Sequence, residues 1–456
     1  MRSVRVGLLL LTILTACTVS GDGQPATTVA TGGATPTNSA EPPPSTTNPS
    51  ASDVYRMVAP SLGFVQTPLA TGSGILLSDG LLVTNAHVVW PFRTVDVSFL
   101  DGTSATALPV VGVDWGADLA LIDVSGVADL DTATAMATTE YAAGDRIYLI
   151  GYPAEDPNAP EPAITTGIIS RTRTWVDGGL RFIQSDALIS GGQSGGALVD
   201  ASGSIIGITS LEIGEGFALA LDGTDVAARI EAILAGGDPA GVGGRWLEDL
   251  ATAEPPQNAA HFLDELVWMF DAVEGDEILI EAKAQTPLSG SIIGPDGFLE
   301  TSLEGDVLAF TAELDGPHFV AIVPDVGFDA RIELQSNVDL TPLRDPDHGV
   351  AIAVGGLEFG NIDYPGDLDW FSIELGEGDE VFVAASSPNA DMGLYIGPLD
   401  DLNGDEARSD SDSGAGVIGA DAEVRYTAVR SGTHIIAVFD ETQFGPGTYA
   451  LRVDAG

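Results

Sequence analysis

The chain of 456 residues contains one cysteine and five histidines. A single cysteine cannot form a disulfide within the chain, and it cannot supply the cysteine ligands of a structural zinc site or an iron–sulfur cluster. Any reaction that needs a histidine has very few candidate residues. These two scarcities restrict the chemistry of the protein before any motif is considered.

Basic residues are also scarce: 17 Lys and Arg stand against 67 Asp and Glu, a formal net charge of -50, and Lys283 is the only lysine. A field of this sign repels phosphates and anionic headgroups, so we expect no nucleic-acid partner and no electrostatic docking to a membrane. The acidity is typical of a highly soluble or salt-adapted surface, and a calcium-loaded surface is the alternative.

Glycine and proline are abundant, with 56 and 27 residues, and 44% of the chain is apolar. This composition favours turn-rich β structure over helical bundles. The length suggests about three domains with connecting segments. We therefore expect an all-β protein of several domains.

The first 17 residues have the pattern of a secretory signal peptide, with Arg2 and Arg5 before the apolar stretch Val6–Leu14. The stretch is shorter than the roughly 20 apolar residues that a membrane span needs. Cys17 follows Leu14-Thr15-Ala16, which resembles the bacterial lipobox. The resemblance implies lipidation of Cys17 and a lipoprotein anchored on the bacterial cell surface or facing the periplasm. Residues 18–51, rich in Thr, Pro and Ser, are expected to form a disordered tether.

Residues 52–236 contain many short apolar segments separated by turn residues, a pattern typical of a β-sandwich or barrel. Apolar residues at helical spacing predict a closing helix over Asp222–Leu234. The predicted strand-sized segments are Val95–Phe99, Leu119–Val124, Ile147–Ile150, Ala163–Ser170, Ile205–Thr209 and Phe217–Leu221.

Three residues of this segment fit nucleophilic serine chemistry, which needs a base, an orienting carboxylate and backbone donors for the oxyanion. His87 is the only histidine before His261, and Asp118 precedes the apolar residues Leu-Ala-Leu. Ser194 lies in a glycine-rich turn that can direct its Oγ outward. For the carboxylate, Asp114, Asp123 and Asp186 compete with Asp118, which we prefer because of its apolar context.

These residues lie in three motifs that resemble the trypsin-like serine proteases, and most closely the bacterial HtrA/Deg branch. The motifs occur in the order of that family, at Thr84–Val88, Asp118–Ala120 and Gly192–Gly196. The resemblance implies two six-stranded β-barrels with the catalytic residues between them.

By the same resemblance, His87 is the general base, Asp118 orients it, and Ser194 is the nucleophile that forms an acyl-enzyme. The backbone N–H groups of Gly192 and Ser194 form the oxyanion hole, and Ser210 lies beside the triad carboxylate. Leu211 begins a segment that pairs with the substrate backbone.

Two departures from digestive members of that family concern activation and specificity. Gln193 replaces the Asp that a new N-terminus would neutralise, so we expect no activation by zymogen cleavage. Leu188 and Ile189, which correspond to the base of the substrate pocket in that family, carry no charge, and this favours cleavage after small or medium apolar residues. Leu211 is expected at the same pocket.

The C-terminal half repeats itself. The pattern Trp-Met-Phe…Gly-Asp-Glu from Trp268 recurs as Trp-Phe-Ser…Gly-Asp-Glu from Trp370, and Gly-Pro-His at 316 recurs as Gly-Thr-His at 432. We predict two β-sandwich modules, at 246–340 and 350–456. The second, with Gly366-Asp367-Leu368-Asp369-Trp370-Phe371 and the closing Gly447–Val453, resembles the bacterial pre-peptidase C-terminal domain, which implies substrate or surface binding. The first is a degenerate version, because it lacks the aspartates before Trp268. The equivalent positions of His318 and His434 predict a structural role for both.

Two acidic loops of the second module, Asp400–Asp405 and Asp410–Gly414, collect hard oxygen ligands as calcium loops do, although neither matches the EF-hand pattern. We expect no cofactor and no catalytic metal, with Ca²⁺ on this module as the alternative.

The sequence thus predicts a lipid-anchored serine endopeptidase whose partners are a protein or peptide substrate and, through Cys17, a membrane. The rival hypothesis is a catalytically silent, protease-fold protein that binds a surface or acts as a scaffold. The oligomeric state is left open.

Overall fold

The computed structural model describes residues 49–77, 80–127, 130, 136–137, 140–155, 159–213, 217–236, 245–252, 266–324, 332–399, 406–410, 421–441 and 447–456. For 211–213 it describes the backbone alone. Cys17, the tether as far as residue 48, His261 and the loops 400–405 and 411–414 lie outside this part of the chain. The anchor and these two acidic loops therefore stay predictions.

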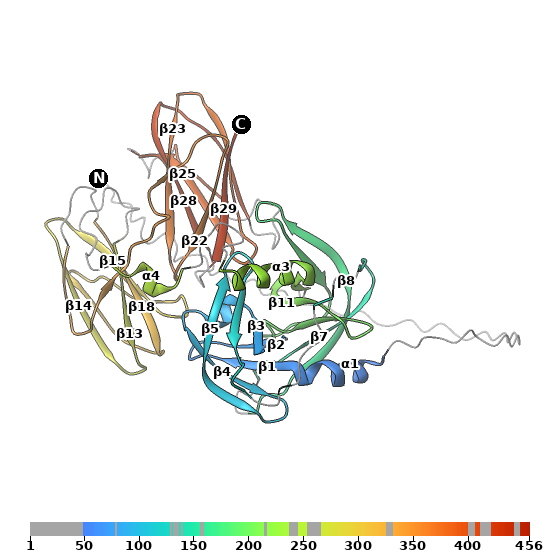
Figure 1. The fold of residues 1–456 in the computed structure, drawn as a ribbon. Coiled ribbons are helices and arrows are strands. Elements are labelled where there is room, and N and C mark those ends of the chain that lie inside the picture. Colours follow the sequence, from blue (N-terminus) through green and yellow to red (C-terminus); the bar gives the residue numbers. More distant parts are fainter. Residues whose placement is uncertain are drawn as a thin grey trace, which may run out of the picture. The chain divides into compact units, whose positions relative to one another are not determined.

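The first barrel closes six antiparallel strands in the order β1-β2-β3-β6-β5-β4 (Figure 1). Its strands alternate between the core and solvent, as β4 shows: Val95, Val97 and Phe99 are buried, whereas Thr94 and Asp96 are exposed. This period of two suits a barrel wall with one buried face. The strands are β1 (Leu62–Gln66), β2 (Thr71–Leu76), β3 (Leu81–Thr84), β4 (Thr94–Phe99), β5 (Ser104–Asp114) and β6 (Leu119–Asp123).

The second barrel has the order β10-β11-β12-β9-β8-β7. Its strands are β7 (Arg146–Gly151), β8 (Ala163–Trp175), β9 (Leu180–Ser185), β10 (Ala197–Asp200), β11 (Ile205–Ile213) and β12 (Phe217–Asp222). The expected pair of six-stranded barrels is confirmed, and each of the six predicted strand segments overlaps a strand of one barrel.

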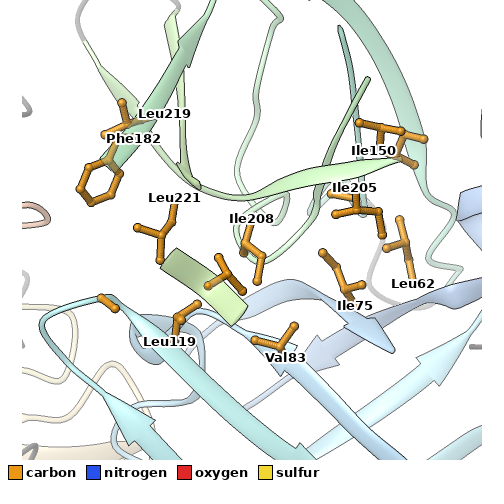
Figure 2. Close-up of a cluster of buried hydrophobic side chains, with 14 of the residues drawn as sticks. Leu62, Ile75, Val83, Leu119, Ile150, Phe182, Ile205, Ile208, Leu219 and Leu221 are labelled. Atoms are coloured by element: carbon orange, nitrogen blue, oxygen red, sulfur yellow. The ribbon is translucent and has the colours of Figure 1, made fainter. Parts of the chain in front are cut away.

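One apolar cluster joins the two barrels. Figure 2 shows Ile75 and Val83 of the first barrel in the same cluster as Ile208 of the second. All three side chains are fully buried. Burying a side chain of this size contributes about 1.5–3 kcal/mol, so the shared cluster holds the barrels together.

Four short helical segments flank these strands: α1 (Ala51–Val58), η2 (Ala59–Ser61), α2 (Ala86–Val89) and α4 (Leu247–Leu250). A longer helix, α3 (Gly223–Leu234), follows β12 and begins at the N-cap Asp222, whose side chain accepts a hydrogen bond from Thr224 N. The predicted closing helix is therefore confirmed. In the described part of the chain, no helix is long and apolar enough to cross a membrane.

The next two sheets form the first C-terminal module. One has the order β16-β15-β18-β13-β20 and the other β17-β14-β19. Trp268 and Phe270 of the first sheet pack in one core with Ile278 and Ile280 of the second, so the sheets face each other. The strands are β13 (Leu266–Ala272), β14 (Glu277–Lys283), β15 (Leu288–Ile293), β16 (Leu299–Ser302), β17 (Val307–Thr311), β18 (Gly316–Pro324), β19 (Glu333–Ser336) and β20 (Thr341–Pro342).

The last two sheets form the second C-terminal module, with the orders β21-β23-β28-β25-β26 and β22-β29-β24-β27. Phe371 and Ile436 of one sheet share a core with Val383 and Leu451 of the other. The strands are β21 (Val350–Ala351), β22 (Gly356–Ile362), β23 (Leu368–Leu375), β24 (Glu380–Ser386), β25 (Met392–Pro398), β26 (Arg408–Asp410), β27 (Ala422–Thr427), β28 (Gly432–Asp440) and β29 (Gly447–Ala455).

The two modules repeat each other in detail. The order β15-β18-β13 in one corresponds to β25-β28-β23 in the other. His318 and His434 are both fully buried, and each donates from Nδ1 to the carbonyl two residues earlier, Gly316 or Gly432, at 3.0 Å. The predicted structural role of both histidines is supported by this shared geometry.

Candidate active site

His87 lies on α2, the single helical turn that follows β3. Its backbone N–H donates to Asp118 Oδ1 at 3.0 Å, and its ring Nδ1 lies 2.8 Å from Asp118 Oδ2. Because a carboxylate oxygen only accepts, Nδ1 carries the proton and Nε2 keeps its lone pair. The His87 side chain is 33% exposed, so solvent or a ligand can reach the imidazole ring.

Asp118 occupies the turn immediately before β6 and has a positive φ of 51°, which is uncommon for a residue other than glycine. Its side chain is buried. Its backbone N–H donates to Trp115 O at 3.2 Å, and Asn85 Nδ2 donates to its carbonyl at 2.8 Å. These bonds offset the backbone strain and fix the carboxylate against the imidazole.

The pKa of His87 reflects two opposing effects. Burial lowers the pKa of the imidazole, whereas the negative charge of Asp118 and the hydrogen bond to it raise the pKa by more, so that the net pKa lies above its ordinary value. Asp118 thus stabilises the imidazolium that forms when His87 accepts a proton.

The competing carboxylates have other partners. Asp114 accepts from Ala117 N at 3.0 Å and pairs with Arg229 of α3 at 3.3 Å, which supports the turn that leads to Asp118. Asp186 accepts from Ile168 N and Asp123 accepts from Ser125 N. Among the described carboxylates, Asp118 is the one that contacts His87.

Ser194 lies in a tight turn of the second barrel. The following Gly195 has φ of 81°, and a Cβ there would lie 2.0 Å from Ser73 O, so only glycine fits. Ser194 O accepts from Ser73 N at 2.7 Å, which ties the turn to the first barrel. Ser194 Oγ donates to Ser210 O at 2.8 Å. In this part of the structure no hydrogen bond joins Ser194 to His87.

Ser210 connects Ser194 to the histidine–carboxylate pair. Its Oγ donates to Asp118 Oδ2 at 2.9 Å while its carbonyl accepts from Ser194. The register of β11 against β12 shifts between Thr209 and Leu211, so the irregularity falls at Ser210. Such a β-bulge redirects a side chain from the regular strand alternation.

Two peptide groups of the serine turn have a fixed orientation. Gly191 O accepts from Ala154 N at 2.8 Å, and Gln193 O accepts from Gly196 N and Thr209 Oγ1. In a trans peptide the C=O and the next N–H point in opposite directions. The N–H groups of Gly192 and Ser194 are therefore directed away from these internal contacts, as donors to an oxyanion must be.

Ser73 is a residue whose role the sequence did not reveal. Its buried hydroxyl donates to Gly192 O at 2.9 Å and accepts from Tyr152 N at 2.8 Å. It thereby holds the peptide that links Gly192 to Gln193. Its place between Gly72 and Gly74 was the only signal in the sequence, since small residues allow two backbones to approach closely.

The predicted pocket residues have different surroundings. The side chain of Leu188 is 69% exposed, and its carbonyl accepts from Thr165 Oγ1 at 2.8 Å. Ile189 packs partly against the apolar core of the second barrel. The backbone of Leu211 belongs to β11, but its side chain lies outside the described residues.

One apolar cluster includes residues close in sequence to the histidine and the carboxylate. Ala86, which precedes His87, and Trp115, whose carbonyl accepts from Asp118 N, share it with residues of α4 and of both C-terminal modules. Trp115 also contacts Trp246 edge to face, with ring centroids 5.9 Å apart. Residues outside the two barrels, in α4 and the C-terminal modules, therefore pack against residues close in sequence to His87 and Asp118.

Comparison with known proteins shows that residues 72–208 match the trypsin-like peptidase domain family. Serine protease HTR4 of Bos taurus is 34% identical over 175 residues, which cover 37% of this chain and 35% of the relative. Serine protease HTRA1 of Xenopus laevis is 34% identical over 187 residues, which cover 37% and 40%. The chain thus spans less than half the length of the curated relatives it matches.

Among solved structures, the serine endoprotease from Yersinia pestis is similar at 28% identity with a TM-score of 0.36, covering 41% of this chain and 67% of that chain. An HtrA-type protease with a tripeptide is similar at 26% identity with a TM-score of 0.38, covering 47% and 70%.

Proposed function

We propose that this chain, whose residues 72–208 form a trypsin-like peptidase domain with HtrA-type relatives, is a serine endopeptidase that acts through an acyl-enzyme. The observation that carries the proposal is the 2.8 Å contact between His87 Nδ1 and Asp118 Oδ2, with Ser194 linked to the same carboxylate through Ser210. In the proposal His87 is the base, Asp118 its orienting group and Ser194 the nucleophile.

The first step transfers the Ser194 proton to His87. The Ser194 hydroxyl turns from Ser210 O toward Nε2 of the imidazole, whose lone pair is available because Asp118 holds the proton on Nδ1. Oγ then attacks the peptide carbonyl, and the resulting oxyanion accepts hydrogen bonds from the N–H groups of Gly192 and Ser194. Removing one such donor typically costs about 3 kcal/mol of transition-state stabilisation.

The second half of the reaction reverses the roles of the same groups. The protonated His87 gives its proton to the leaving amine, and the peptide bond breaks to leave an ester on Ser194. Water, deprotonated by His87, hydrolyses the ester. No additional acid or base is required.

The proposed substrate is a protein cleaved after small or medium apolar residues. The uncharged Leu188 and Ile189 support this preference, since a buried carboxylate is what would select Lys or Arg. A cleavage profile on a peptide library tests it, and a dominant preference for Lys or Arg would contradict it.

We further propose that the enzyme is a bacterial lipoprotein, on the cell surface or facing the periplasm, with the two C-terminal modules binding substrate or a surface. The apolar N-terminal segment and Cys17 support the anchor, and the likeness of the second module to pre-peptidase C-terminal domains supports the binding role. Globomycin-sensitive processing and loss of membrane association in Cys17→Ala test the anchor.

An activity-based probe tests the peptidase proposal and its scaffold rival together. A fluorophosphonate should label the full-length protein and leave Ser194→Ala unlabelled, because only an activated hydroxyl reacts. Ser202→Ala is the matched control, since Ser202 is an exposed turn serine of the same barrel. Equal labelling of Ser194→Ala, or no casein turnover by the natural sequence, would favour the scaffold.

A further inference from the structure

A buried acidic cluster lies away from the candidate active site, within and before the second C-terminal module. Asp345 and Asp347 come from the connection between the two modules, and Asp363, Asp367 and Asp369 come from the end of β22 to the start of β23. The last three side chains are 4%, 2% and 0% exposed. Five carboxylates in such an environment need compensating positive charge.

One guanidinium supplies part of that charge. Arg245 forms an ion pair with Asp347 and another, at 3.1 Å, with Asp363. Arg245 therefore lies between Asp347 and Asp363. In the described part of the chain it forms no hydrogen bond with the other three aspartates, Asp345, Asp367 and Asp369.

Each of the remaining three aspartates has one carboxylate oxygen that accepts a hydrogen bond and one that does not. Asp367 Oδ2 accepts from Asp363 N at 2.7 Å and Asp369 Oδ2 accepts from Tyr449 Oη at 2.5 Å. Within the described part of the chain, Asp345 Oδ2, Asp367 Oδ1 and Asp369 Oδ1 are buried and accept no hydrogen bond.

A histidine completes a set of metal-binding atoms at this point. One oxygen of Asp345, one of Asp369 and a ring nitrogen of His348 all lie within 4.8 Å of one another. His348 Nδ1 donates to Leu368 O at 3.1 Å, since a carbonyl only accepts, and the ring lone pair is therefore on Nε2. Metal-binding histidines usually have this arrangement, in which a backbone carbonyl fixes the tautomer.

We propose that Asp345, His348 and Asp369 bind one divalent metal ion, which clamps the connection between the modules onto the second module. Bonds of about 2.0–2.4 Å from a central ion reach ligand atoms as far apart as about 4.8 Å. The buried Asp367, two residues before Asp369, has a carboxylate oxygen, Oδ1, that accepts no hydrogen bond in the described part of the chain. The imidazole nitrogen favours Zn²⁺ or Mn²⁺ over Ca²⁺, which prefers an all-oxygen set. The site is separate from the two acidic loops that the sequence suggested for calcium.

Metal titration of the full-length protein tests the proposal. The protein is stripped with EDTA, dialysed, and titrated with ZnCl₂, MnCl₂ or CaCl₂ in a calorimeter, and its thermal unfolding is followed in parallel. We expect one equivalent of Zn²⁺ or Mn²⁺ to bind at this site and to raise Tm by on the order of 5 °C at a hundredfold excess over Kd.

Variants of the proposed ligands test whether the bound metal ion occupies the site formed by Asp345, His348 and Asp369. Asp369→Asn should lose the equivalent and the rise in Tm, yet the metal-free variant should melt no lower than the metal-free natural protein, because one crowded carboxylate is gone. If Asp369→Asn does not fold, Asp345→Asn, on a less buried residue, replaces it. Asp339→Asn, at an exposed position between β19 and β20 of the first module, is the control and should bind normally.

The outcomes separate clearly. Loss of one equivalent in Asp369→Asn or Asp345→Asn but not in Asp339→Asn supports the site. No binding of any of the three ions, or unchanged stoichiometry in both cluster variants, overturns it. Tighter binding of Ca²⁺ that is unaffected by His348→Gln overturns the place of the imidazole in the ligand set. None of these readouts depends on peptidase activity.

Discussion

Replacing Asp118 by asparagine is the sharpest test of the proposed catalytic pair, because it preserves shape and reverses hydrogen-bond polarity at one atom. Asp118 accepts three hydrogen bonds, from His87 N, His87 Nδ1 and Ser210 Oγ. In Asp118→Asn the amide oxygen can still accept from His87 N, but the NH₂ group then faces two donors. His87 must place its proton on Nε2, where it cannot accept the proton of Ser194.

The expected fall in kcat follows from the hydrogen bonds that Asp118→Asn removes. Two hydrogen bonds to a charged group are removed, each worth about 1.5–3 kcal/mol, so the transition state loses about 3–6 kcal/mol. At 1.36 kcal/mol per factor of ten, kcat should fall by about 10²- to 10⁴-fold. The known effect of the same change in a serine protease triad, about 10⁴-fold, lies at the upper end of this range.

The assay is kcat on a fluorogenic apolar peptide together with the rate of fluorophosphonate labelling, each measured beside a thermal unfolding curve. Asp123→Asn is the matched control, since Asp123 ends the strand that Asp118 precedes and its carboxylate caps Ser125 N at 2.9 Å. The control should stay within about twofold of the natural enzyme, as surface changes usually do. A native-like Asp118→Asn protein that keeps kcat within about tenfold would refute the proposed role.

Two further predictions concern the base and the oxyanion hole. Because neutral His87 is the active form and its pKa is raised above 6.5 by Asp118, kcat/KM should increase with pH through a midpoint above that value. A flat profile from about pH 4 to 8 would contradict this. At Gly192, where φ is 88°, a Cβ would lie 2.6 Å from Ala154 N and 2.7 Å from Tyr152 O. Gly192→Ala should therefore distort the turn and lower kcat by about 10²- to 10³-fold, and an unchanged kcat would argue against an oxyanion hole at this peptide.

Local sequence patterns predicted much of the fold because their physical causes are local. The helix α3 begins at Asp222, whose short acidic side chain caps the first turn as the sequence indicated. The alternation of buried and exposed residues in β4 has the period that any half-buried strand requires. The repeated Gly-x-His patterns placed His318 and His434 at equivalent positions because each module folds by the same local rules.

Other contacts of the candidate site could not be predicted in this way. Ser73 supports the serine turn across 119 residues of sequence, through its bond to Gly192 O. A serine between two glycines has many possible roles, and only the packing of one barrel against the other selects this one. Leu188 and Ile189 are adjacent in the sequence, yet Leu188 is exposed whereas Ile189 packs partly against the core of the second barrel, a difference that linear position alone did not predict.

The sequence by itself determined much of the available chemistry. It has one histidine before residue 261 and a serine in a glycine-rich turn, and it has too few cysteines for a disulfide or a cysteine-ligated metal site. Tertiary structure decided which groups meet. Ser210 reaches Asp118 across 92 residues through a bulge in β11, and Asp369 of β23 lies near Asp345 and His348, which precede β21. The physical reason is that propensity, turns and capping act over a few residues, whereas hydrogen bonds and ion pairs between distant residues depend on how whole sheets pack.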